Sequence, residues 1–82
     1  MAQLKELKIM FKTGDLTGCE IDQDIEKNYM LFVFSKSGNE WIALETQRTG
    51  NINDDYRRFT TLDAAIKVAQ SIGFKGTKLV LK

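Results

Sequence analysis

The stretch FTTLDAAIKVAQSIGF, from Phe59 to Phe74, decides the fold class because it carries the signals of one amphipathic helix. Its apolar residues recur at helical spacing and form one stripe: Leu62, Ala65, Ile66, Ala69 and Ile72. Thr60 is suited to cap the helix, with Asp63 three residues later. Gly73 supplies the left-handed residue that commonly ends a helix. The sequence therefore predicts one helix over residues 61–72.

Extended segments are predicted on both sides of this helix. Leu4 to Lys12 alternates apolar and charged residues, and a period of two is typical of a half-buried strand. Tyr29 to Ser35 is aromatic, branched and apolar on both faces, which predicts the central strand. Lys36 to Asn39 reads as a hairpin turn. The remaining strands are expected at Cys19–Glu26, Glu40–Arg48, Tyr56–Phe59 and Thr77–Leu81.

These elements predict a single domain over residues 1–82. Eighty-two residues suffice for one core, and the chain has no proline and no Gly/Ser-rich tract that would mark a linker. We expect an α+β fold, with a mostly antiparallel sheet of 4–6 strands and one helix packed on one face. The expected element order is ββββ(β)αβ.

Composition argues against catalysis and against a bound metal. The chain has no histidine and one cysteine, so the commonest general base and metal ligand is missing. Asn51, Asn53, Asp54 and Asp55 offer oxygen ligands, but the loop lacks the glycine and terminal glutamate of a calcium-binding hand. We expect no enzyme activity, no catalytic residue and no cofactor.

The same composition indicates a cytoplasmic protein. Its longest apolar run, Met30 to Phe34, is far below the roughly 20 residues that span a bilayer. Cys19 has no second cysteine with which to form an internal disulfide, as small secreted domains usually do. Beside Glu20 and Asp22 its thiolate is disfavoured, so we expect Cys19 to be a small core or edge residue.

Charge is nearly balanced overall, at +1, but it is uneven along the chain. From Tyr56 onward six basic residues face one acidic residue, Asp63, whereas ten acidic residues precede Tyr56. A basic edge with aromatic neighbours can hold a nucleic-acid backbone while rings stack on bases. The candidate nucleic-acid-binding residues are Trp41, Arg48, Tyr56, Arg57 and Arg58. The alternatives are an amphipathic strand with its arginines in water, and packing of Trp41 on the sheet.

Acidic residues concentrate between positions 15 and 26 and support a different hypothesis. A protein-interaction or inhibitor module could use them against a basic partner: Asp15, Glu20, Asp22, Asp24 and Glu26. The plain alternative is a solvated acidic strand face. Complementary acidic and basic edges could also meet between subunits, which leads us to expect a homodimer. The expected partners are thus a second copy and a nucleic acid or another protein, without a membrane.

Three features of the second half of the chain form one pattern over about residues 40–81. They are a predicted strand that ends in Arg48, the helix start Arg57-Arg58-Phe59-Thr60-Thr61-Leu62-Asp63-Ala64-Ala65, and the closing pair Gly73-Phe74. In this pattern the chain resembles small orphan proteins carried by bacterial plasmids and integrating elements. The resemblance implies an accessory role in the maintenance or transfer of such an element.

Overall fold

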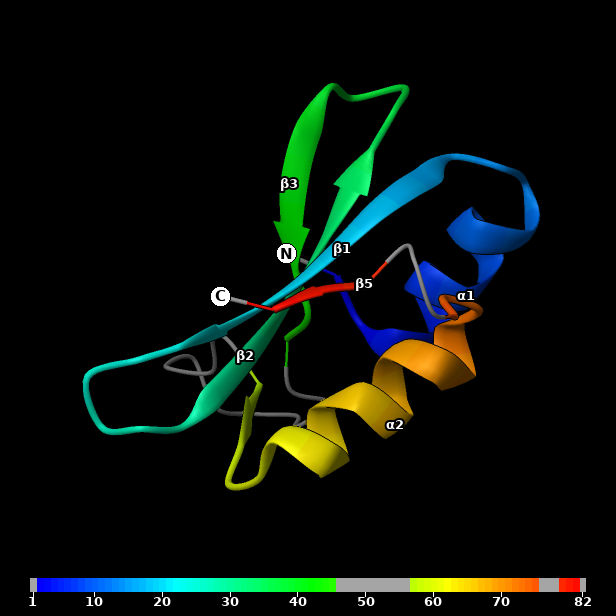
Figure 1. The fold of residues 1–82 in the computed structure, drawn as a ribbon. Coiled ribbons are helices and arrows are strands. Elements are labelled where there is room, and N and C mark those ends of the chain that lie inside the picture. Colours follow the sequence, from blue (N-terminus) through cyan, green and yellow to red (C-terminus); the bar gives the residue numbers. More distant parts are fainter. Residues whose placement is uncertain (1, 46–56, 76–78, 82) are drawn as a thin grey trace, which may run out of the picture.

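The computed structural model describes residues 2–45, 57–75 and 79–81 and shows a small α+β domain (Figure 1). In these residues the chain forms two helices and five strands. In chain order they are α1 (Leu4–Lys12), β1 (Leu16–Gln23), β2 (Tyr29–Ser35), β3 (Glu40–Ala43), β4 (Arg58–Phe59), α2 (Leu62–Ile72) and β5 (Leu79–Leu81). The α+β class is as the sequence predicts, but the order begins with a helix.

The sheet is built around β2, which confirms Tyr29–Ser35 as the central strand. The strand order is β3-β2-β1-β5, and β4 also pairs with β2. β2 runs antiparallel to β1 along one edge and to β3 and β4 along the other. β5 is parallel to β1, so the sheet is mixed. Both helices lie on one side of the sheet, as Figure 1 shows.

The core lies between this side of the sheet and the helices. Alternate residues of β1 and β2 point into it and are almost fully buried: Cys19, Ile21, Leu31 and Val33. Helix α2 contributes Ala65, Ala69 and Ile72, and Leu7 of α1 has no exposed surface. Phe74, just beyond α2, is 1% exposed. Cys19, predicted to be a small core or edge residue, therefore lies in the core.

Residues 4–12 form a helix, so the prediction of a strand there and of a single helix in the chain is wrong. Alternation of Leu7, Ile9 and Phe11 suggested a strand, but Ile9 is 56% exposed whereas Leu7 is buried. The apolar residues that pack inward are Leu4, Leu7, Met10 and Phe11, whose spacing is also helical. Phe11 meets Phe74 edge to face, with ring centroids 5.0 Å apart. This contact docks α1 against the end of α2.

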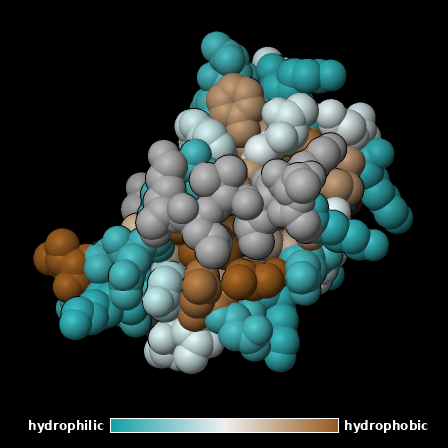
Figure 2. All heavy atoms as spheres, viewed as in Figure 1, coloured by the Kyte–Doolittle hydropathy of each residue, from teal (hydrophilic) through white to brown (hydrophobic). Residues whose placement is uncertain are grey.

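Several smaller boundaries also differ from the prediction. Strand β1 begins at Leu16, before the predicted Cys19, and β3 ends at Ala43, within the predicted Glu40–Arg48. The N-cap of α2 is Thr61, whose hydroxyl accepts a hydrogen bond from the Ala64 N–H at 3.2 Å, and not Thr60. Strand β1 ends at Gln23, so Asp24 and Glu26 lie in the turn that follows it and not on a strand face. Ile25 is fully exposed there, and Figure 2 shows hydrophobic atoms projecting over this turn.

Candidate interaction surfaces

Neither helix covers the second face of the sheet. Side chains alternate along a strand, so Met30, Phe32 and Phe34 point away from the buried Leu31 and Val33. We call this face the open sheet face. Residues that pair directly across strands share a face. The open sheet face therefore also carries Gly18, Glu20, Asp22, Trp41, Ala43 and Arg58.

Trp41 packs on this face and remains 47% exposed. Its ring meets Phe34 edge to face, with centroids 5.3 Å apart and planes 67° apart. The far end of the indole lies over Gly18, where an added Cβ would sit 3.5 Å from the Trp41 Cη2. Gly18, Phe34 and Trp41 thus form one cross-strand row, with a residue lacking a side chain at one end and an indole at the other.

The predicted basic and aromatic group is dispersed in the described residues. Trp41 pairs with Phe34 of β2, whereas Arg58 pairs with Met30 of the same strand. Met30 and Phe34 are four residues apart, so Trp41 and Arg58 are separated by about 13 Å along β2. The Arg57 guanidinium lies over the Phe59 ring, 4.9 Å from its centroid. Arg48 and Tyr56 lie outside the described residues.

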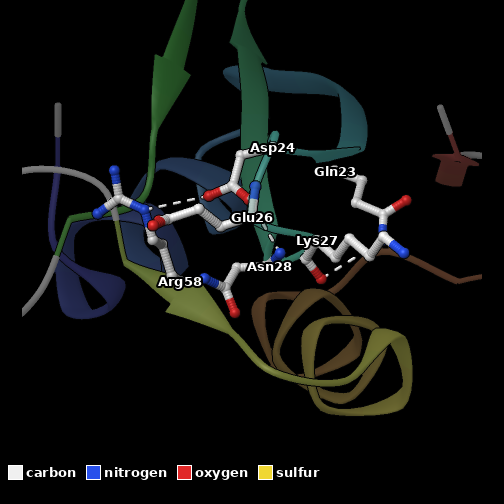
Figure 3. A network of polar contacts seen from close by, with 6 residues as sticks. All are labelled: Gln23, Asp24, Glu26, Lys27, Asn28 and Arg58. Atoms are coloured by element: carbon white, nitrogen blue, oxygen red, sulfur yellow. Dashed lines mark hydrogen bonds and ion pairs between the residues drawn. The ribbon is translucent and has the colours of Figure 1, made fainter.

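One member of the basic group contacts the acidic segment directly. Arg58 Nε donates to Asp24 Oδ2 at 3.3 Å, as Figure 3 shows. The other oxygen of this carboxylate, Oδ1, accepts from the backbone N–H groups of Glu26 and Asn28, each at 2.9 Å. Asp24 therefore organises the turn between β1 and β2, in which Lys27 adopts a φ of 66°. Its carboxylate has a structural role.

Asp15 has a similar role at the other end of the sheet. Its carboxylate accepts hydrogen bonds from Ser35 Oγ and from the Ser37 N–H, both at 2.7 Å. These bonds, above all that from Ser35, lower the pKa of Asp15 below its ordinary value. Ser35 Oγ in turn accepts from the Gly38 N–H at 3.2 Å. Asp15 thus fixes the hairpin turn between β2 and β3.

The other predicted acidic residues differ in their surroundings. Glu20 and Asp22 lie on the open sheet face, and Glu26 is exposed in the turn after β1. Asp22 Oδ1 is buried and has no hydrogen-bond partner among the residues that the structure describes. Beside Glu20, burial raises the pKa of the Cys19 thiol to about 12, with the Glu20 charge as the second cause. A thiol held in this way is a poor nucleophile.

Helix α1 presents a basic surface that the prediction of a strand over residues 4–12 did not reveal. Lys5, Lys8 and Lys12 are exposed and follow helical spacing, so they line the side opposite Leu7; we call them the lysine face. Among the described residues none of the three forms an ion pair. Glu6, the one acidic residue of α1, accepts from the Gln3 N–H at 3.3 Å. Helical periodicity applied to residues 4–12 would have found this surface.

Lys75 adds a cation near the same end of α1. It is exposed and directly follows Phe74, whose ring contacts Phe11 beside Lys12. By contrast, Lys67 of α2 pairs with Asp63 at 3.2 Å. The helical side of the domain therefore gathers cations on α1, whereas the open sheet face carries the acidic residues of β1.

Within the described part of the chain, no cluster of three or more Cys, Asp or Glu side chains is arranged to hold a metal ion. Neither helix there combines the length and apolar character that a membrane span needs. Comparison with protein-family models, with curated proteins and with solved structures finds no match to this chain.

Proposed function

We propose that this chain is a small non-enzymatic binding protein that contacts a nucleic-acid backbone through the lysine face. The observation that carries the proposal is the alignment of Lys5, Lys8 and Lys12 on one exposed stripe without an ion-pair partner in the described residues. Exposed lysines that form no ion pair within the protein are available to bind phosphate groups. This surface replaces the edge around Arg57 and Arg58, because Arg58 contacts Asp24 and Arg57 stacks on Phe59.

The spacing of the lysine face suits a phosphate backbone. A helix rises about 1.5 Å per residue, so Lys5 and Lys12 lie about 10 Å apart along α1. A nucleic-acid strand carries one phosphate per roughly 3.4 Å of duplex axis. Three cations over this length match the charge density of one strand. Ile9 is the one large apolar residue that α1 exposes, and its other apolar residues face the core, so α1 presents no continuous hydrophobic face to a lipid surface.

Nucleic-acid binding of this kind would suit an accessory role in the maintenance or transfer of a plasmid or integrating element. The resemblance of residues 40–81 to small proteins of these elements supports this wider role. The alternative function is the binding of a basic protein by the acidic residues between positions 15 and 26. Fewer carboxylates are available for it, because those of Asp15 and Asp24 accept hydrogen bonds that stabilise two turns.

The test is a titration of a fluorescent 20-base-pair DNA duplex, followed by anisotropy at several salt concentrations. Each neutralised phosphate contributes about 0.9 to the slope of log affinity against log salt. We expect a slope of about −2 to −3 for the wild type. A variant with Lys5→Gln, Lys8→Gln and Lys12→Gln should lose nearly all of that slope.

The matched control replaces three exposed lysines outside the lysine face: Lys27→Gln, Lys36→Gln and Lys67→Gln. It has the same net charge as the test variant but should bind almost as the wild type does. Equal loss in both variants would mean that net charge alone governs binding, and this result contradicts the proposal. Absence of duplex binding, together with binding of an oligoarginine peptide that Asp22→Asn and Glu26→Gln abolish, would establish the alternative.

A further inference from the structure

Helix α1 leaves one large apolar side chain, that of Ile9, in solvent at the centre of its outward side. Ile9 is 56% exposed, whereas Leu7 has no exposed surface and Met10 and Phe11 pack against the core. A helix turns by about 100° per residue, which places Ile9 about 160° from Leu7 around the helix axis. Ile9 therefore points away from the core and contributes little to its packing.

The lysine face lies directly beside Ile9. Lys5 precedes Ile9 by four residues and Lys12 follows it by three, so both are its neighbours on the helix surface. By the same angular count, Lys5, Lys12 and Lys8 lie about 40°, 60° and 100° from Ile9, all on one side of it. A ligand that follows the three lysines therefore also reaches Ile9. Such a ligand carries a row of phosphates and, beside them, an apolar group.

We infer that α1 enters the major groove of B-form duplex DNA and that Ile9 contacts the C5 methyl groups of thymines there. This inference rests on the proposed binding of a nucleic-acid backbone by the lysine face. A helix with its side chains is about 10–12 Å across, and the major groove is about 12 Å wide. The thymine methyl is the apolar group that the base pairs present in this groove. Figure 1 shows α1 at the periphery of the domain, where a duplex can approach it.

Other nucleic acids match this arrangement less well. The major groove of an A-form RNA helix is deep and too narrow for side chains to read. RNA also carries uracil, which lacks the C5 methyl group. An unpaired strand would gain from base stacking, but the exposed indole of Trp41 lies on the open sheet face, on the side of the sheet opposite the helices. The observations therefore favour duplex DNA.

Replacement of thymine by uracil tests the contact without a change in charge or base pairing. A fluorescent 20-base-pair DNA duplex rich in A·T pairs is compared with the same duplex carrying uracil at every thymine position, by anisotropy at low salt. The wild type should bind the thymine duplex about fourfold more tightly, because burial of one methyl group contributes about that factor. Duplex RNA of the same sequence should bind at least tenfold more weakly than the thymine duplex.

Ile9→Ala should abolish the preference for thymine while it leaves the salt slope and the thermal unfolding of the protein unchanged. The matched control is Ile25→Ala, which removes an equally large and fully exposed side chain from the turn between β1 and β2 and should retain the preference.

Three results would overturn the inference and leave backbone binding by the lysine face intact. They are equal affinity of the wild type for the thymine and uracil duplexes, a thymine preference that persists in Ile9→Ala, and equal affinity for duplex RNA and duplex DNA. Failure of the wild type to bind any duplex would instead overturn both this inference and the proposed function.

Discussion

Arg58 Nε lies 3.3 Å from Asp24 Oδ2, and this contact ties strand β4 to the turn between β1 and β2. It joins two residues 34 positions apart in the sequence, one from each of the oppositely charged segments. The two segments therefore meet at this point in the fold, which is why cations of the lysine face, and not Arg58, carry the proposed function.

The Asp24 carboxylate should matter more for its bonds to the turn than for its ion pair. Asp24→Ala removes the acceptor of two backbone N–H groups and should lower the free energy of unfolding by about 1–3 kcal/mol. Asp24→Asn keeps an acceptor oxygen and should cost less. Arg58→Gln should cost less than about 1 kcal/mol, because the arginine is 43% exposed. Urea unfolding measures all three, and a larger loss for Arg58→Gln than for Asp24→Ala would contradict this ranking.

Docking of α1 on α2 leaves no room for a side chain at Gly73. Its φ is 138°, and an added methyl group would overlap with the Phe11 ring. Gly73→Ala should therefore destabilise the fold by more than about 2 kcal/mol, from strain and overpacking together. Gly14 has a φ of 85° but open space around it, so Gly14→Ala should cost only about 1 kcal/mol. Equal losses in thermal or urea unfolding would mean that Phe11 does not pack there.

The Asp15 contacts should make stability depend on pH in the acidic range. The folded state lowers the pKa of Asp15, so the ionised form is favoured by folding. Its contribution is fully present above the ordinary carboxyl pKa and is lost as the pH falls through the lower folded value. The difference in unfolding free energy between the wild type and Asp15→Asn should be largest at pH 6 and should shrink towards pH 2. A difference that is constant across this range would contradict the assignment.

The Cys19 thiol should be unreactive in the native state. Its pKa is raised to about 12, and only 1% of the residue is exposed. At pH 8 a disulfide reagent such as dithionitrobenzoate should modify it only as fast as the fold opens, and quickly in 6 M urea. A raised pKa also means that stability is lost as the pH rises above 9, where the unfolded thiol begins to ionise. Rapid native labelling at pH 8 would show that the thiol is not buried.

Local patterns in the sequence were sufficient for the two elements that organise the domain. The apolar stripe of residues 62–72 and Gly73 predicted α2, and the apolar run of residues 29–35 predicted β2. In both segments the periodicity, the composition and the flanking turn residues agree, so tertiary contacts had nothing to override.

A strand was predicted for residues 4–12, where the structure has a helix, because the apolar residues of this segment fit both a strand period and a helical period. Leu7, Ile9 and Phe11 satisfy a period of two, whereas Leu4, Leu7 and Phe11 satisfy a helical one. The contact between Phe11 and Phe74, 63 residues away, is a tertiary interaction that no local pattern contains. The misreading also concealed the lysine face, because a strand would divide Lys5 and Lys8 between two faces.

The candidate site was only partly predictable for a related reason. Counting charges along the chain showed an imbalance, but it could not show that Asp24 would meet Arg58 or that Asp15 would bind Ser35. Those contacts depend on which strands pair and in which register. Once the register is known, the set of residues that share the open sheet face follows directly from the sequence.

A nuclear magnetic resonance titration of the isotope-labelled protein with a 12-base-pair DNA duplex at low salt tests the proposed lysine face most directly. We expect the amide shifts to change mainly in residues 4–12 and at Lys75, and to return to their free values when salt is added. Shift changes confined to Trp41 and Arg58, or no change at any residue, would contradict nucleic-acid binding through α1.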